Sequence, residues 1–198
     1  ISSEAAVVME NTTNTILYSK NADEVLFPGS TVKIMTCLLA LENTQLTDEV
    51  TMTATGVSGV TDGGASISSQ VDEVFTVEQC LYAIMVASAN DIALQIAEHV
   101  GGSVDGFVQQ MNTRAQELGC TNTVFTNPTG LPDDNQHTTA HDMALIMQAA
   151  IQNESFRTIA AATSYTIPAT NKAAARNLTS KFTMTAVSYT HLRAHETE

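Results

Sequence analysis

The sequence predicts an α+β fold that opens with a β-hairpin and continues mainly as helices. Two short apolar runs, residues 5–10 and 15–19, flank the polar cluster 11–14, which is the pattern of a hairpin. Apolar residues then recur at helical spacing in several segments between residues 31 and 162. Residues 165–168 return to a short strand pattern. Strands at the start and helices after them place the chain in the α+β class.

The composition is that of a folded domain that does not bind nucleic acid. Of 198 residues, 43% are apolar and 15% are charged, which is far from the composition of disordered chains, and we expect one cooperative unit. With 8 basic against 21 acidic residues, the formal net charge of −13 would repel a polyphosphate backbone or an anionic membrane surface. The sequence has no run of about 18 apolar residues, so we expect no membrane anchor within this chain.

The first helices are predicted on either side of a short strand. Pro28-Gly29-Ser30 precedes residues 31–41, an apolar run long enough for a buried helix. Residues 50–53 are a candidate strand, and the Gly- and Ser-rich residues 56–69 are predicted to be a loop. A capping-box pattern at Thr76 starts a helix through residues 80–86, which is apolar nearly all round and therefore expected in the protein interior.

The second half is predicted to be helical up to a final strand. Asp91 is a candidate cap for a helix over residues 92–100, and residues 104–118 form the clearest amphipathic helix. Turn-forming residues 127–135 predict a loop, and helices are expected over 139–153 and 156–162. The pattern is lost near residue 186. We therefore interpret residues 1–185 as the domain and 186–198 as a tail outside it.

The cysteines and histidines do not predict a metal centre. The three cysteines have no C-x-x-C spacing, so neither a disulfide framework nor a zinc site is encoded, and we expect buried thiols at Cys37, Cys80 and Cys120. His191 and His195 do not match H-E-x-x-H, which needs its Glu directly after the first His. Structural or capping roles are expected for His137 and His141.

Ser30 and Lys33 form an S-x-x-K motif at the start of the first predicted helix. Residues three apart lie on one helix face, so the hydroxyl and the amine can meet, and the helix N-terminus favours negative charge developing near Ser30. Apolar neighbours predict a desolvated Lys33, and desolvation lowers a lysine pKa from about 10.4 toward that of a neutral-pH base. The motif alone is weak, because S-x-x-K occurs by chance about once in a chain of this length, and lysines in apolar helices can snorkel to solvent.

A second polar triplet, Ser88-Ala89-Asn90, lies at the exit of the apolar helix that starts at Thr76. There it could face a cleft, although serine and asparagine are also ordinary helix-terminating residues. The combination of motifs carries more weight than either one. In order along the chain they are PGSTVKIMT at 28–36, ASAND at 87–91, NPTGLPD at 127–133 and TTAHDM at 138–143.

These four stretches, in this order, resemble the penicillin-binding D-alanyl-D-alanine carboxypeptidases of the low-molecular-mass type, over roughly residues 5–178. The resemblance implies a β-lactamase and transpeptidase architecture, an antiparallel sheet flanked by helices with a helical subdomain. It implies that Ser30 attacks the penultimate D-alanine carbonyl, that Lys33 accepts its proton, that Ser88 relays a proton to the leaving D-alanine, and that Asn90 orients Lys33 and the substrate. The Ser30 backbone N–H would be one oxyanion donor.

The implied partners are a peptidoglycan stem peptide ending in D-Ala-D-Ala and β-lactam antibiotics, with no cofactor and no metal. The implied location is extracytoplasmic, and the start at Ile1 fits removal of a signal peptide as well as a trimmed chain.

One family element is absent: no lysine of the chain is followed by Thr-Gly, so the K-T-G strand and the strands that close the sheet are expected to be missing. Two alternatives follow. One is a class A β-lactamase, although no E-x-x-L-N stretch follows Ser88. The other is a non-catalytic fragment or binding module.

Overall fold

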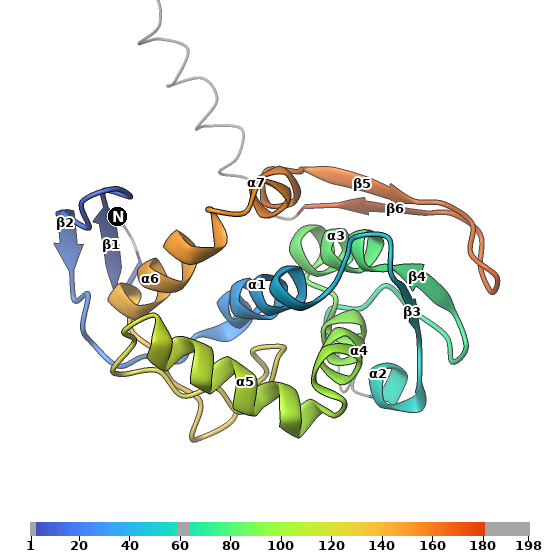
Figure 1. Cartoon of the computed structure of the whole chain (residues 1–198), viewed down its shortest axis with the longest axis horizontal. Coiled ribbons are helices and arrows are strands. Elements are labelled where there is room, and N and C mark those ends of the chain that lie inside the picture. The colour runs from blue at the N-terminus through green and yellow to red at the C-terminus, as the bar shows by residue number, and fades with distance from the viewer. Residues whose placement is uncertain (1–2, 59–63, 181–198) are drawn as a thin grey trace, which may run out of the picture.

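Helix α1 (Lys33–Asn43) lies at the centre of the molecule (Figure 1). In the computed structural model, which describes residues 3–58 and 64–180, four longer helices pack against it: α3 (Val77–Ala87), α4 (Asn90–Gly101), α5 (Val104–Glu117) and α6 (Ala140–Ala150). A shorter helix, α7 (Glu154–Ala160), also contacts α1 and α3. The prediction of a buried helix after Ser30 is confirmed, because nearly every residue from Met35 to Ala40 is inaccessible to solvent.

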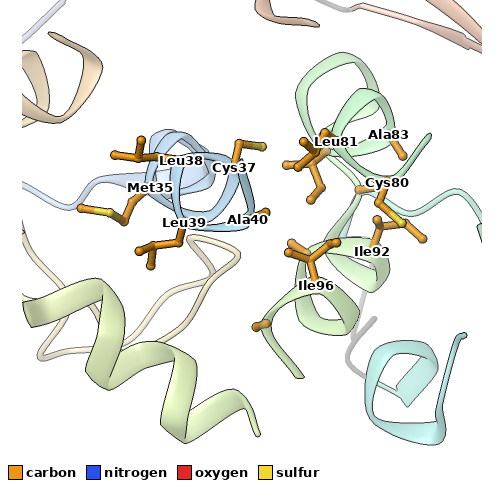
Figure 2. Packing of buried hydrophobic residues seen from close by; sticks show 14 of the residues in the cluster. Met35, Cys37, Leu38, Leu39, Ala40, Cys80, Leu81, Ala83, Ile92 and Ile96 are labelled. Atoms are coloured by element: carbon orange, nitrogen blue, oxygen red, sulfur yellow. The ribbon is translucent and has the colours of Figure 1, made fainter. Parts of the chain in front are cut away.

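The hydrophobic core fills the space between α1 and the pair α3–α4. Figure 2 shows Cys37 and Ala40 of α1 on the side that faces Leu81 of α3 and Ile96 of α4. Leu81 and Ile96 have no exposed surface. Because a fully buried Leu or Ile side chain contributes about 1.5–3 kcal/mol, this contact fixes the position of α3 and α4 relative to α1.

The strands in the described ranges pair as three separate two-stranded antiparallel sheets. β1 (Ala6–Met9) pairs with β2 (Ile16–Lys20), which confirms the predicted hairpin. β3 (Glu49–Thr51) pairs with β4 (Val74–Thr76), and β5 (Ser164–Ile167) pairs with β6 (Arg176–Thr179). The α+β class is thus observed. β4 and β6 were not predicted from the sequence, because their short segments show little alternation of apolar and polar residues.

Side-chain caps begin most of the helices. The capping box predicted at Thr76 is present, because Thr76 Oγ1 accepts from Gln79 N and Gln79 Oε1 accepts from Thr76 N. The side chains at the N-cap positions of α5, α6 and α7 each accept a backbone N–H of the first turn; they belong to Ser103, Thr139 and Asn153. Each such cap is worth about 1 kcal/mol, so these helix starts are strongly defined by local sequence.

Two sequence-based expectations are wrong. The first turn after β3 is a short helix, α2 (Ala54–Ser58), where a loop was predicted from residue 56. Contacts to α4 override the low helix propensity of this segment: the carboxylate of Glu98 accepts from the hydroxyls of Thr53 and Thr55. Asp91 is not the N-cap of α4, because the helix begins at Asn90, two residues earlier than predicted, and its N-cap is Ala89, which has no capping side chain.

The cysteines are buried as predicted. Burial raises the pKa of the Cys37 and Cys80 thiols well above the usual value, which makes them inert apolar side chains, and all three cysteines are free. Among residues 3–58 and 64–180, no helix combines the length and apolar character needed to cross a bilayer. The predicted tail, with His191 and His195, lies outside the described residues.

An apolar groove lies beside β1. Its volume is about 610 Å³, and its walls come from β1, the segment 26–28 and helix α6. Several large apolar side chains on β1, β2 and the following segment are exposed, among them Leu17 at 66%, Val25 at 53% and Phe27 at 48%. The groove borders the Ser30 turn through Pro28 and Thr31.

A buried ion pair fastens the β5–β6 hairpin to the β3–β4 hairpin. Arg176 donates to both carboxylate oxygens of Glu73, at 2.7 and 2.9 Å, and Thr170 Oγ1 donates to the same carboxylate. Glu73 is fully buried and the Arg176 side chain is 16% exposed. Burial opposes ionisation, but the hydrogen bonds from Arg176 and Thr170 hold the pKa of Glu73 below its usual value.

We predict that Glu73→Gln lowers the free energy of unfolding by about 3 kcal/mol, because it leaves a largely buried guanidinium without its counter-charge. Urea denaturation at pH 7 measures the change. The matched control is Glu117→Gln, in a pair whose glutamate is 57% exposed, and it should cost no more than about 0.5 kcal/mol. Equal effects of the two substitutions would contradict the role given to Glu73.

Candidate active site

Ser30 lies in a tight turn that leads directly into the central helix. Residues Gly29–Val32 form a single 3-10 turn, α1 starts at Lys33, and the Lys33 N–H donates to the Ser30 carbonyl. Gly29 has φ +55°, a left-handed conformation that glycine adopts without a steric penalty. The Ser30 side chain is exposed. The turn therefore presents Ser30 to solvent at the N-terminal end of a buried helix, and the sequence predicted this position at the helix start.

Lys33 is buried one turn further on. The residue is 3% exposed, and burial lowers the pKa of its amine to about 8. The predicted desolvation of Lys33 is thereby confirmed. Its Nζ donates to the carbonyl oxygen of Thr129 at 2.5 Å. In the part of the chain that the structure describes, no hydrogen bond joins this amine to Ser30 or Ser88.

The loop 127–131 is packed onto the Ser30 turn. Besides the bond from Lys33 to Thr129, Thr36 Oγ1 donates to the Pro128 carbonyl at 2.8 Å. Gly130 has φ +81°, and a Cβ built there would lie 1.9 Å from the Gly29 carbonyl oxygen. Only glycine fits this contact. The turn-forming residues predicted a loop here, but nothing in the sequence indicated that this loop packs against the Ser30 turn.

Ser88 and Asn90 occupy the junction between α3 and α4. Ser88 is the C-cap of α3 with φ 56°, a left-handed conformation that is uncommon for serine. Asn90 is 5% exposed and begins α4, and its backbone N–H donates to the Ala65 carbonyl at 2.7 Å. Strained residues of this kind persist where the surrounding structure fixes them, and they cluster at functional sites.

Asp91, the residue that follows the triplet, joins the start of α4 to residues 66–69. Its carboxylate accepts hydrogen bonds from the hydroxyls of Ser66 and Ser69 at 2.8 Å each, and from the Ser69 backbone N–H. Asp91 is 1% exposed. This explains the failed prediction of a helix cap: the carboxylate is engaged with residues 66–69, which it holds against the start of α4. The sequence contains no signal for that pairing.

The S-x-x-K motif and the triplet Ser88-Ala89-Asn90 lie on helices that contact each other. Both α3 and α4 pack against α1, so Ser88 and Asn90 are carried by the helices that cover the helix of Lys33. An exposed serine three residues before an amine with a pKa of about 8 is suited to nucleophilic attack with a lysine as base. The site therefore has the make-up of a serine acyl-transfer centre.

Two of the three histidines of the described region, His137 and His141, have polar groups within hydrogen-bonding distance. His141 Nδ1 lies 3.2 Å from Asp23 Oδ1, and His137 Nδ1 lies 2.9 Å from the Asn135 carbonyl oxygen. Within residues 3–58 and 64–180, no three His, Cys, Asp or Glu side chains are grouped in a way that could hold a metal ion.

Comparison with known proteins identifies the family. The family model described as D-alanyl-D-alanine carboxypeptidase (Peptidase S11) matches residues 1–192. The chain belongs to this family. It is 38% identical over 157 residues to the D-alanyl-D-alanine carboxypeptidase DacF of Bacillus subtilis, covering 77% of this chain and 40% of that protein. It is 33% identical over 162 residues to DacC of Escherichia coli, again covering 77% and 40%. The chain thus spans about 40% of the length of these two relatives.

Solved structures of the same kind share the fold. A mutant of the Streptomyces K15 DD-transpeptidase superimposes with a TM-score of 0.87 at 30% identity, covering 94% of this chain and 77% of that one. Penicillin-binding protein 5 from Haemophilus influenzae gives a TM-score of 0.84 at 28% identity, covering 96% and 55%. The transpeptidase-like architecture expected from the resemblance is thereby confirmed.

The depressed pKa of Lys33 should appear in the stability of the fold. Between about pH 8 and pH 10.5 the lysine is more fully protonated in the unfolded chain than in the folded chain. Burial of the charged amine therefore lowers the free energy of unfolding by its full amount below pH 8, and this loss is recovered as the pH rises toward 10.5. We predict that, between pH 7 and pH 10, the free energy of unfolding of wild type rises by about 2–3 kcal/mol relative to that of Lys33→Met, measured by urea unfolding. Lys172→Met, at an exposed lysine, should show the pH dependence of wild type. A Lys33→Met protein with that same dependence would argue against the lowered pKa.

Proposed function

We propose that the protein containing this chain is a serine-type D-alanyl-D-alanine carboxypeptidase that removes the terminal D-alanine from peptidoglycan stem peptides. The observation that carries the proposal is an exposed Ser30 three residues before buried Lys33, whose pKa is about 8, in a member of this family. A lysine of ordinary pKa would be almost fully protonated at neutral pH, whereas this amine is a usable base.

In the proposed reaction, the Ser30 hydroxyl attacks the carbonyl of the penultimate D-alanine while Lys33 takes its proton. The peptide bond breaks, the terminal D-alanine leaves with a proton relayed through Ser88, and an acyl-enzyme on Ser30 remains. Water then hydrolyses this ester and regenerates the serine. Asn90 orients Lys33 and the substrate, and the Ser30 backbone N–H is one donor to the oxyanion.

The proposed partners follow from this chemistry. A stem peptide ending in D-Ala-D-Ala is the substrate, and β-lactams acylate Ser30 because their strained amide presents a similar carbonyl to the same nucleophile. Because stem peptides are part of the cell wall, we propose an extracytoplasmic location for the protein, reached by secretion. The negative net charge argues against nucleic acid as a further partner.

The proposal predicts covalent labelling of Ser30 by a fluorescent penicillin, read on a denaturing gel. Ser30→Ala should abolish the label, and Lys33→Arg should reduce its rate at least about 10²-fold, since a guanidinium stays charged and cannot act as base. The matched control is Ser155→Ala, on α7, which should label like wild type.

Labelling that survives Ser30→Ala would refute the nucleophile, and wild-type rates in Lys33→Arg would refute the base. If the folded chain takes up no label at all, the alternative of a non-catalytic binding module is favoured. Rapid turnover of the penicillin after acylation would instead favour a β-lactamase.

A further inference from the structure

The side chain of Asn127 organises the loop that holds Lys33. Its Oδ1 accepts three hydrogen bonds, from Thr129 N at 3.2 Å, Thr129 Oγ1 at 2.9 Å and Gly130 N at 2.8 Å. Its Nδ2 donates to the Leu131 carbonyl at 3.0 Å. One half-buried amide thus satisfies four groups of residues 129–131 and closes the loop on itself.

This closure determines where the Thr129 carbonyl points. With both the N–H and the hydroxyl of Thr129 bound to Asn127, the peptide that follows has little rotational freedom, and its oxygen accepts from Lys33 Nζ at 2.5 Å. Thr129 is 2% exposed, so water cannot readily replace this acceptor. Asn127 therefore acts on the amine through a single intervening residue.

The side-chain amide of Gln136, which lies outside the loop, forms hydrogen bonds to both ends of it. Gln136 Oε1 accepts from the backbone N–H groups of Thr126 and Asn127, and Gln136 Nε2 donates to the Leu131 carbonyl. Gln136 is 3% exposed. Both ends of the loop 127–131 are thus bonded to one buried side chain, which fixes the position of Asn127 as well as that of the loop.

We propose that Asn127 is a positioning residue for Lys33: by locking the Thr129 carbonyl, it holds one N–H of the amine and leaves the lone pair of the neutral form available for the Ser30 proton. The inference rests on the proposed function, because it assigns a purpose to the base of that reaction. An amine held by one carbonyl needs no reorganisation before it accepts a proton, which is the advantage of a preorganised base.

The carbonyl has a measurable electrostatic consequence. A carbonyl oxygen stabilises an ammonium more than a neutral amine, so it raises the lysine pKa and partly offsets the effect of burial. Releasing the Thr129 carbonyl by removing the Asn127 amide should therefore lower the titration midpoint of Lys33 further. We expect a fall of about one pH unit in Asn127→Ala, given the strength of hydrogen bonds to charged groups.

The test is an NMR titration of the chain labelled with ¹³C at the lysine ε-carbons. The Lys33 signal is assigned by its loss in Lys33→Arg, and wild type should titrate near pH 8. Asn135→Ala is the matched control, because Asn135 is an exposed asparagine of the neighbouring turn whose backbone bonds to Asp133 and His137 do not depend on its side chain. Its titration should equal that of wild type.

Two further variants keep the test decisive if Asn127→Ala does not fold. Thr129→Val removes one of the three bonds to Asn127 Oδ1, together with the acceptor of the Leu131 N–H, and the midpoint should fall by a smaller amount. Asn127→Asp keeps the three acceptor contacts and adds negative charge, so the midpoint should not fall. An unchanged midpoint in folded Asn127→Ala, or in Thr129→Val if the alanine variant is unfolded, would overturn the proposal. The titration requires no turnover, so its result is independent of whether Ser30 is labelled by penicillin.

Discussion

The contact between the loop 127–131 and the Ser30 turn is the constraint on which the site depends. At Gly130 the two backbones are so close that a single methyl group would overlap the Gly29 carbonyl. Thr36 and Lys33, which are 92 and 96 residues away from their loop partners, add hydrogen bonds to the Pro128 and Thr129 carbonyls. Together these contacts hold the serine turn, Lys33 and the loop against one another.

The buried setting of Lys33 follows from the packing of apolar helices around α1. Since most residues of α1 are buried, Lys33 in its first turn is largely shielded from bulk water, and its amine loses part of its affinity for the proton. A burial cost of this kind is tolerated because the Thr129 carbonyl satisfies one N–H. The fold thus loses some stability and gains an amine that is partly neutral near physiological pH, which the proposed role of Lys33 as base requires.

Local patterns were enough to predict the elements and motifs that depend on nearby residues. The hairpin, the buried helix after Ser30 and the capping box at Thr76 each follow from neighbours within a few positions. The family motifs propose Ser30, Lys33, Ser88 and Asn90 as site residues. Features that depend on distant partners were missed or misassigned. The helix α2 forms against Glu98, the Asp91 carboxylate binds residues 66–69, and Asn127 matters because its loop meets a turn almost a hundred residues earlier.

The most direct test of this account is the rate at which benzylpenicillin acylates Ser30 in Gly130→Ala, measured by intact-protein mass spectrometry on protein shown to be folded. Gly119→Ala is the control, because Gly119 has a similar φ of +86° but open space where its Cβ would lie. Both substitutions strain the backbone, and only Gly130→Ala pushes the loop off the serine turn. We expect acylation to slow at least about 10²-fold in Gly130→Ala and to remain near wild type in Gly119→Ala. Equal rates in the two variants would contradict the claim that the docked loop sets the geometry of the site.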